Sequence, residues 1–297
     1  MVWVSAEAIA QWRQTAQQQA IVEEIPSSEV DWLLQSLTGL DRLSLRLNLP
    51  EAIELPFELR ELETLWQRRI RDRVPVQYLA QSAPWRQFSL QVSPAVLIPR
   101  PETELLIDLA IQAANSADLT AGIWADLGTG SGAIAIGLAA ALPNAAIHAV
   151  DISLEALAIA QANATALHFD RIQFHHGRWF EPLAPWQGQL SAIVSNPPYI
   201  PTAMLADLQP EVRLHEPQLA LDGGADGLAA IRHLAIEAPK YLRSHGLWLI
   251  EMMSGQAAAV RELLQQHGYQ QIEIHRDLAG IDRFAIAFTP PLAKDVF

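Results

Sequence analysis

From about residue 120 onward, short apolar runs alternate with longer segments that mix apolar and polar positions. Apolar runs of this length between turn-forming residues predict buried strands, and the longer segments between most of them predict helices. We expect strands at 123–127, 146–151, 171–175, 190–195, 246–251, 270–275 and 283–288. This alternation predicts an α/β fold with a doubly wound parallel sheet. Because only the short loop from Asp277 to Asp282 joins the last two strands, we expect them to form an antiparallel hairpin.

The first 88 residues have a different pattern, in which apolar side chains recur at helical spacing. We expect helices from Ser5 to Ala20, from Ser28 onward with this serine as the cap, and from Pro56 to Arg73. The tryptophans of this region are expected in its core. Phe88 to Val92 alternates like a strand, which predicts a connecting hairpin at about 86–98. The two expected domains are a helical domain at 1–88 and an α/β domain at 89–297.

Composition narrows the class of protein. The chain has 297 residues, half of them apolar, which suffices for one large core or two unequal domains. No apolar run approaches the length that a bilayer requires, and no basic stretch followed by an apolar core lies near the N-terminus. The absence of cysteine excludes disulfides, thiolate metal sites and a cysteine nucleophile. We therefore expect a cytoplasmic protein without a membrane partner.

Charge and histidine positions limit the possible ligands. The formal net charge is −13, whereas a protein that grips a nucleic-acid backbone generally presents a basic patch, so we expect no DNA partner. One basic cluster lies between Arg68 and Arg73. It fits either a solvated helix end or a contact for an acidic protein partner or the RNA around it. The adjacent pair His175 and His176 lies in a predicted strand, where successive side chains face opposite ways, so no metal site is expected there.

A glycine-rich loop follows the strand predicted at 123–127. Gly128, Gly130 and Gly132 stand before an alanine-rich helix, where glycine permits a tight turn and a close approach of a ligand to the main chain. Asp151 ends the next predicted strand, 19 residues beyond Gly132, where a carboxylate can bind both hydroxyls of a ribose. Sheets that bind NAD and sheets that bind S-adenosylmethionine share this arrangement. The spacing Gly-x-Gly-x-Gly weakens the dinucleotide interpretation but leaves both open.

The second motif, Asn196-Pro197-Pro198-Tyr199, directly follows the apolar run at 190–195. Prolines cannot continue a central strand, and they keep the preceding residue extended, so the Asn196 carboxamide is expected at the carboxyl end of a strand. The Asn196 oxygen and the Pro197 carbonyl can accept both hydrogens of a planar –NH2 group while Tyr199 covers its face. The motif therefore suits a site that acts on an amide or exocyclic amine nitrogen. A proline-stiffened turn without chemistry is the alternative.

Together the two motifs resemble those of the amino-methyltransferases in the class I, Rossmann-like superfamily. Three further segments, at 97–104, 216–228 and 277–283, are similar to the protein-(glutamine-N5) methyltransferases that modify peptide chain release factors. The resemblance covers the chain from about Arg73 to Arg283 and, more weakly, the helical N-terminus. It implies a Rossmann-like, seven-stranded methyltransferase domain with a small N-terminal helical bundle that docks the substrate.

The resemblance also implies the site residues, with S-adenosyl-L-methionine as the cofactor and no metal. The cofactor-binding residues are expected to be Gly128, Thr129, Gly130, Ser131, Gly132, Asp151, Trp179 and Asn196. The expected catalytic residues are Asn196, Pro197 and Tyr199, and the expected substrate-binding residues are Asn196, Pro197, Pro198, Tyr199 and Arg100. For Arg100 the alternative is a helix-start motif. Arg178 departs from the aspartate usual before the tryptophan, so no carboxylate contact to the adenine amine is expected there. The role of Glu251 stays open because the segment around it also departs from the usual pattern.

The implied reaction transfers a methyl group to the side-chain amide nitrogen (N5) of a glutamine in the Gly-Gly-Gln loop of class I peptide chain release factors, which supports translation termination. The enzyme is expected to be a monomer. The first alternative is a nucleic-acid methyltransferase acting on adenine N6 or guanine N2 through the same Asn-Pro-Pro-Tyr chemistry, and the acidic charge counts against it. The second is a cofactor-binding regulatory protein without catalysis, which two intact motifs disfavour.

Overall fold

The computed structural model describes residues 2–46 and 52–291. The chain forms two compact units. The helical unit comprises residues 1–82 and the later segment Gln209–His215. The sheet unit comprises Ala83–Leu208 and Glu216–Phe297. The sequence did not predict that Gln209–His215 belongs to the helical unit, because this segment lies between two parts of the predicted α/β domain.

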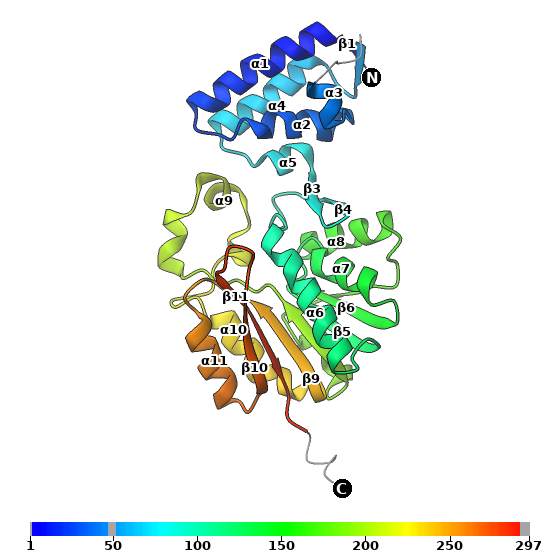
Figure 1. The fold of residues 1–297 in the computed structure, drawn as a ribbon, viewed down its shortest axis with the longest axis vertical. Helices are drawn as coiled ribbons and strands as arrows, with labels where there is room; N and C mark the ends of the chain where they lie inside the picture. Colours follow the sequence, from blue (N-terminus) through cyan, green and yellow to red (C-terminus); the bar gives the residue numbers. More distant parts are fainter. Residues whose placement is uncertain (1, 47–51, 292–297) are drawn as a thin grey trace. The chain divides into compact units, whose positions relative to one another are not determined.

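The elements of the helical unit are α1 (Ala6–Val22), α2 (Ser28–Thr38), α3 (Arg42–Arg46), α4 (Leu59–Arg71), α5 (Val76–Ala80), α9 (Pro210–His215), β1 (Val2–Ser5) and β2 (Ala52–Leu55). The Ser5 hydroxyl caps α1 by accepting a hydrogen bond from the Ala8 amide at 3.2 Å. Ile9, Trp12 and Ala16 form a buried stripe on α1, which packs against α2 and α4 (Figure 1). The helices predicted in these regions are confirmed.

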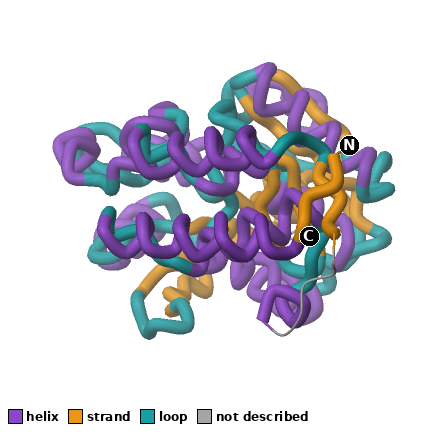
Figure 2. The backbone as a smooth tube through the Cα atoms, turned by 90° about the horizontal axis from the view of Figure 1, so that it is seen from above, coloured by secondary structure: helices purple, strands orange, loops and turns teal. Residues whose placement is uncertain are grey.

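Two details of the helical unit differ from the prediction. Val2–Ser5 and Ala52–Leu55 pair as an antiparallel ladder, with Val2 opposite Leu55, in a region predicted to be helical. Figure 2 shows this strand, in orange, at the label N, leading into a helix in purple. Ser28 is the first residue of α2 and does not cap it; the Val30 amide instead donates to the Ser27 carbonyl at 3.3 Å. A local turn therefore satisfies an amide that a cap at Ser28 would have served.

The basic cluster at Arg68–Arg73 includes a buried residue. Arg69 is 4% exposed and forms ion pairs with Glu29 at 2.6 Å and with Glu211 of α9 at 2.7 Å. Both interpretations of the cluster assumed exposed side chains, and for Arg69 both are wrong. Its guanidinium presents several donors in a fixed plane, which allows it to bind two carboxylates at once. Arg69 therefore links α2, α4 and α9 within the helical unit.

The sheet unit contains a seven-stranded sheet in the order β10-β11-β9-β8-β5-β6-β7. Its strands are β5 (Gly122–Leu127), β6 (Ala145–Asp151), β7 (Gln173–His176), β8 (Leu190–Ser195), β9 (Leu242–Glu251), β10 (Gln270–Arg276) and β11 (Asp282–Phe288). Every predicted strand is present. Strands β5 to β9 pair in parallel, whereas β11 runs antiparallel to both β9 and β10. The terminal antiparallel hairpin is thus confirmed.

Helices cover both faces of this sheet (Figure 1). One apolar cluster contains residues of α6 (Glu104–Ser116), α7 (Ala133–Ala141) and the end of α8 (Leu154–Ala166). The other contains residues of α10 (Ala229–Glu237) and α11 (Ala257–Gln266). Shorter 3-10 helices are η1 (Pro101–Thr103), η2 (Glu181–Trp186), η3 (Thr202–Asp207), η4 (Gln218–Ala220) and η5 (Ala238–Lys240). Strands β5, β6, β8, β9 and β11 are largely buried and appear in the sequence as nearly continuous apolar runs, whereas the edge strands β7 and β10 are exposed or half-buried and contain more polar residues.

Most strand boundaries lie within one or two residues of the prediction, and two differ by more. The connecting hairpin is formed by β3 (Ser82–Trp85) and β4 (Phe88–Gln91), earlier than the predicted 86–98, because Pro84 concealed the first strand. Strand β9 begins at Leu242, ahead of the predicted 246, and a register shift lies between its pairings with Leu190 and Ala192. None of the helices in the described ranges combines the length and apolarity that crossing a membrane requires.

Candidate active site

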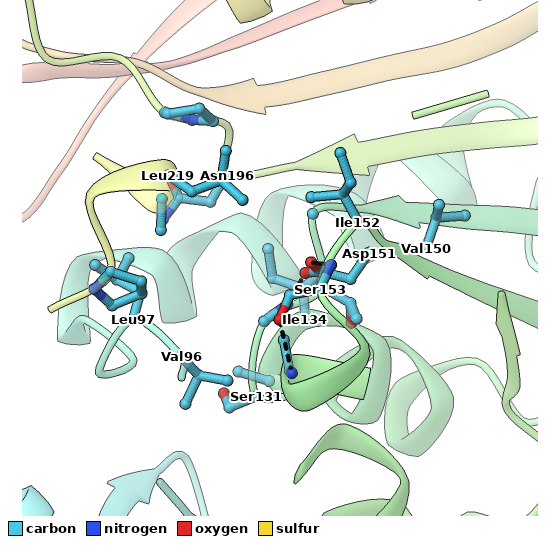
Figure 3. Close-up of a pocket in the computed structure, with 18 of the residues that line it drawn as sticks. Val96, Leu97, Ser131, Ile134, Val150, Asp151, Ile152, Ser153, Asn196 and Leu219 are labelled. Carbon is cyan, nitrogen blue, oxygen red and sulfur yellow. Dashed lines mark hydrogen bonds between the residues drawn. The ribbon is translucent and has the colours of Figure 1, made fainter. Parts of the chain in front are cut away.

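A cavity of about 660 Å³ lies in the sheet unit where β5, β6 and β8 end. Figure 3 shows Asp151 and Ser153 at one part of its wall and Asn196 and Leu219 at another. The residues that line it from the predicted motifs are Arg100, Gly128, Thr129, Gly130, Ser131, Asp151, Arg178, Trp179, Asn196 and Pro198. Ligands of parallel sheets bind beyond the carboxyl ends of the strands, and this cavity has that position.

The glycine loop lies between β5 and α7. Gly128, Gly130 and Gly132 have φ values of +78°, +54° and +82°, in the left-handed region that glycine adopts without strain. A Cβ at Gly128 would meet the Trp179 ring at 3.5 Å, so the indole lies directly beside this part of the loop. Gly132 does not line the cavity in the described structure. A Cβ there would lie 3.2 Å from the Ala160 Cα, which assigns this glycine to packing against α8.

Asp151 at the end of β6 is held by two main-chain amides. Its Oδ2 accepts from Gly130 N at 2.8 Å and its Oδ1 from Ser153 N at 2.9 Å. Burial raises its pKa, and the bonds from Ser153 and Gly130 oppose that shift. The carboxylate lines the cavity with a fixed orientation, as the binding of a ribose diol requires.

Asp126 was not assigned a role from the sequence, yet it braces the glycine loop. Its Oδ2 accepts from the Thr129 hydroxyl at 2.6 Å and from the Ala135 amide at 3.0 Å. Its Oδ1 is buried without a hydrogen-bond partner among the described residues. Burial raises the pKa of Asp126 to about 7. A carboxylate inside an otherwise apolar strand, just before the glycines, was the signal that could have identified it.

Trp179 and Arg178 lie on the loop after β7. Trp179 has φ = +51°, which is uncommon for a residue with a side chain, and it lines the cavity beside Gly128. The Gly177 amide donates to the Asp151 carbonyl at 3.0 Å, which ties this loop to the end of β6. The indole is thereby placed on the same cavity wall as the glycine loop.

The residues of the Asn-Pro-Pro-Tyr motif differ from one another in their surroundings. Asn196 and Pro198 line the cavity. The Asn196 Nδ2 donates to the Thr103 Oγ1 at 3.2 Å. Tyr199, predicted to cover the substrate amide, donates its hydroxyl to the Glu251 Oε1 at 3.0 Å, and burial raises its pKa. The structure thus shows an anchored Tyr199, and contact of Tyr199 or the Pro197 carbonyl with a substrate stays a prediction.

Thr103 and Glu251 were not predicted as site residues. The Thr103 hydroxyl donates to the Glu251 Oε2 at 2.6 Å. Both side chains are buried, and burial raises the pKa of Glu251. Glu251 is the last residue of β9, so its carboxylate lies at the strand-end edge that carries Asn196. An acidic residue that ends a buried strand was the available signal.

Arg100 forms an ion pair with Glu216, with its Nη2 2.6 Å from the Glu216 Oε1. The Glu216 Oε2 also accepts from the Ile98 amide at 3.3 Å. Burial raises the pKa of Glu216, and the adjacent guanidinium opposes that shift. Arg100 is one-third exposed and lines the cavity, so it remains available to a ligand.

Two histidines of the sheet unit, His148 and His175, form a pair. His148 Nδ1 lies 2.9 Å from His175 Nε2, whereas His176 Nε2 lies 3.0 Å from the Ile152 carbonyl. The side chains of His175 and His176 thus have separate partners, as their alternation along β7 requires. Burial lowers the pKa of His148 to about 4. In the described parts of the chain, no three His, Cys, Asp or Glu residues are grouped so as to hold a metal ion.

The fold and site together define a class. The chain has a seven-stranded sheet in which β11, next to one edge strand, is antiparallel to its neighbours. It also has a glycine loop after β5 and a carboxylate at the end of β6. These features define a Rossmann-like methyltransferase. Family comparison agrees, since the methyltransferase small domain matches residues 103–208. The PrmC N-terminal domain matches residues 7–80.

Relatives identify the family within this class. The chain is 52% identical to a release factor glutamine methyltransferase of Synechocystis sp., over 97% of this chain and 98% of the relative. It is 50% identical to one of Thermosynechococcus vestitus, over 97% of this chain and 100% of the relative. The chain belongs to the release factor glutamine methyltransferase family.

Among solved structures, the hMettl16 catalytic domain in complex with a 3'UTR hairpin covers 82% of this chain and 86% of its own, with 16% identity and a TM-score of 0.54. At this identity the likeness supports the fold alone.

Proposed function

We propose that this enzyme transfers a methyl group from S-adenosylmethionine to the side-chain N5 nitrogen of a glutamine in class I peptide chain release factors, within their Gly-Gly-Gln loop. The observation that carries the proposal is the position of Asn196, whose carboxamide lines the same cavity as the glycine loop and Asp151. The names of the Synechocystis and Thermosynechococcus relatives support the same substrate.

The donor set of the cavity fits the cofactor. Gly128 and Gly130 leave the loop without side chains, Asp151 presents an oriented carboxylate for the ribose hydroxyls, and Trp179 offers a flat face for the adenine. Thr129, Ser131 and Asn196 complete the proposed cofactor contacts. S-adenosylmethionine supplies a methyl carbon already activated by its sulfonium. The proposed reaction therefore requires no metal.

The enzyme's own groups hold the substrate amide. A carboxamide nitrogen is a poor nucleophile because its lone pair is delocalised into the carbonyl. The Asn196 Oδ1 and the Pro197 carbonyl accept its two hydrogens and orient the nitrogen toward the methyl carbon. Such orientation can lower the barrier by several kcal/mol, up to about 7–11 in the best intramolecular cases. The N–C bond forms as the bond between the methyl carbon and the sulfonium sulfur breaks, which leaves neutral S-adenosyl-L-homocysteine. The two oxygens stabilise the positive charge that develops on the nitrogen, and one of the held hydrogens then passes to solvent water as a proton.

The partner is proposed to be a protein. Exposed apolar side chains of the helical unit, Ile21 and Val22 among them, offer a surface for a release factor, and the net charge of −13 disfavours DNA or bulk RNA. We assign substrate docking to the N-terminal domain predicted at 1–88, which contains most of the helical unit, and methyl transfer to the domain predicted at 89–297. We also propose that the enzyme acts as a monomer in the cytoplasm, where translation termination occurs.

Labelled S-adenosylmethionine tests the proposal. The enzyme is incubated separately with an intact release factor, with the same factor carrying Gln→Glu in its Gly-Gly-Gln loop, and with bulk RNA and DNA. Label is expected in the intact factor alone. Label in nucleic acid alone would support an exocyclic-amine methyltransferase instead, and label in the Gln→Glu factor would place the modified residue elsewhere.

A further inference from the structure

A chain of hydrogen bonds joins Asn196 to a buried carboxylate. Asn196 Nδ2 donates to Thr103 Oγ1 at 3.2 Å, and Thr103 Oγ1 donates to Glu251 Oε2 at 2.6 Å. The other oxygen of Glu251 accepts from the Tyr199 hydroxyl at 3.0 Å. Thr103 is 4% exposed and Glu251 is 1% exposed, so little solvent competes for these bonds.

The direction of these hydrogen bonds follows from the number of hydrogens that each group can donate. A threonine hydroxyl has one hydrogen, and an ionised carboxylate can only accept. Thr103 must therefore donate its hydrogen to Glu251 and can only accept from Asn196. The two ends of a carboxamide are nearly equal in shape, so hydrogen-bond partners alone determine which end faces which way. The –NH2 end of Asn196 consequently faces Thr103, and its Oδ1 is left for the cavity.

We propose that Thr103 and Glu251 are positioning residues that fix which end of the Asn196 carboxamide faces the substrate. With Oδ1 toward the cavity, the site accepts hydrogens and selects a planar –NH2 group. With the carboxamide reversed, the site would donate hydrogens and repel that group. This inference rests on the proposed function, since it explains how the site recognises an amide nitrogen and not an amide oxygen.

The groups around Glu251 act on its pKa in both directions. Burial raises the pKa, as does the neighbouring Glu102, whereas the hydrogen bonds from Thr103 and Tyr199 and the charge of Arg283 of β11 lower it and favour the ionised form, which can only accept. Arg283 is itself held by Asp277 at 2.9 Å, so the favourable charge has a fixed position.

Glu251→Gln tests the direction of the chain without changing its shape. If the side-chain oxygen of the introduced glutamine keeps the bond from Tyr199, the amide of that glutamine donates to Thr103, and Thr103 then donates to Asn196. Every partner is satisfied, but the carboxamide is reversed. We expect kcat for release-factor methylation to fall about tenfold or more, because an oriented acceptor is replaced by a donor. Thermal stability and cofactor affinity should stay near wild type. Wild-type kcat in Glu251→Gln would overturn the role of Glu251.

Thr103 variants separate positioning from packing. Thr103→Val removes the acceptor for Asn196 and should lower kcat about tenfold while KM for the release factor changes little. Thr103→Ser keeps the hydroxyl and should restore most of the activity. The matched control is Thr289→Val. Thr289 is 2% exposed, and its hydroxyl likewise donates, to the Arg243 carbonyl at 2.7 Å, and accepts, from the Gly246 amide at 2.9 Å. It follows β11, whose last residue pairs with Leu247, and so it lies at the opposite end of the strands from Asn196 and Glu251. Equal losses of kcat in Thr103→Val and Thr289→Val would overturn the proposal.

A substrate-free measurement separates this inference from the proposed function. The side-chain amide NMR signals of Asn196 can be identified by their loss in Asn196→Asp. They should shift in Thr103→Val and in Glu251→Gln, and stay unchanged in Thr289→Val. If wild-type enzyme fails to methylate a release factor but these shifts occur, only the proposed function is wrong. If methylation occurs and the signals do not move, only the positioning role is wrong.

Discussion

At the residue scale, Asn196 carries the proposed chemistry because its carboxamide lines the cavity while Thr103 holds one end of it. Asn196→Ala removes the acceptor for the substrate amide but leaves Asp151 and the glycine loop in place. We expect turnover to be abolished while cofactor affinity stays within a few fold. Calorimetric titration with S-adenosylmethionine and the labelled release-factor assay check the two parts. A variant that retains turnover but binds the cofactor tenfold more weakly would contradict the assigned role.

Asp126 is expected to make stability depend on pH. Its pKa is about 7 in the folded protein, against about 4 in an unfolded chain, so between these values the folded state binds one more proton. The free energy of unfolding should therefore fall as pH rises through this range, by up to about 1.4 kcal/mol per pH unit, and level off above about pH 7. Asp126→Asn keeps an acceptor for Thr129 and cannot titrate. Urea unfolding from about pH 5 to pH 8 should show a flatter profile for this variant, and parallel profiles would disprove the assignment.

At the residue scale, the sequence predicted the site residues that lie at or just after the end of a strand. Asp151 ends a strand, and Trp179 and Asn196 follow the carboxyl ends of two others, so they were expected in one site, and all three line the cavity. Thr103 and the anchored Tyr199 hydroxyl were missed, because both depend on the buried Glu251 reached across the sheet. Such a contact is set by strand order, and no local spacing encodes it.

At the element scale, the start of α7 depends on a glycine that packs and does not line the cavity. Gly132→Ala places a Cβ at 3.1 Å from the Ala160 Cβ and requires a left-handed φ of +82°. Gly268→Ala, with φ = +77° and open space around it, is the matched control. We expect Gly268→Ala to lower the free energy of unfolding by about 1 kcal/mol and Gly132→Ala by about 1–2 kcal/mol more. Cofactor affinity should fall only in Gly132→Ala. Equal urea midpoints and equal affinities would show that contact with α8 is unimportant.

The elements themselves were predictable to different degrees. Strands β5, β6, β8, β9 and β11 were found because their burial leaves nearly continuous apolar runs, although the edge strands β7 and β10 are only partly buried. The β1–β2 ladder was missed because its strands have only four residues each and lie far apart in the sequence. Pro84 concealed β3, since proline is uncommon inside strands. Pairing partners that are distant in sequence leave no periodic trace.

At the scale of the whole molecule, the chain enters the helical unit twice. Gln209–His215 belongs to the helical unit, while Leu208 before it and Glu216 after it belong to the sheet unit. Within the helical unit, Arg69 binds Glu211, and His215 Nε2 lies 2.6 Å from the Asp72 carbonyl. Glu216, the next residue, holds Arg100 at the cavity. The peptide bond between His215 and Glu216 therefore joins the helical unit directly to a charged pair of the site.

Arg69→Met tests this connection. Removing the guanidinium leaves Glu29 and Glu211 without their partner, and we expect the free energy of unfolding to fall by about 3 kcal/mol, the lower end for buried ion pairs, because both carboxylates keep some exposure. The segment 209–215 should become sensitive to limited proteolysis, located by mass spectrometry. We expect kcat to fall more than cofactor affinity, because this segment leads directly in sequence into Glu216, which holds Arg100. Arg68→Met removes the same charge from the exposed side of the same helix and is the control. If both variants lose equal stability and resist protease equally, α9 is held by something other than Arg69.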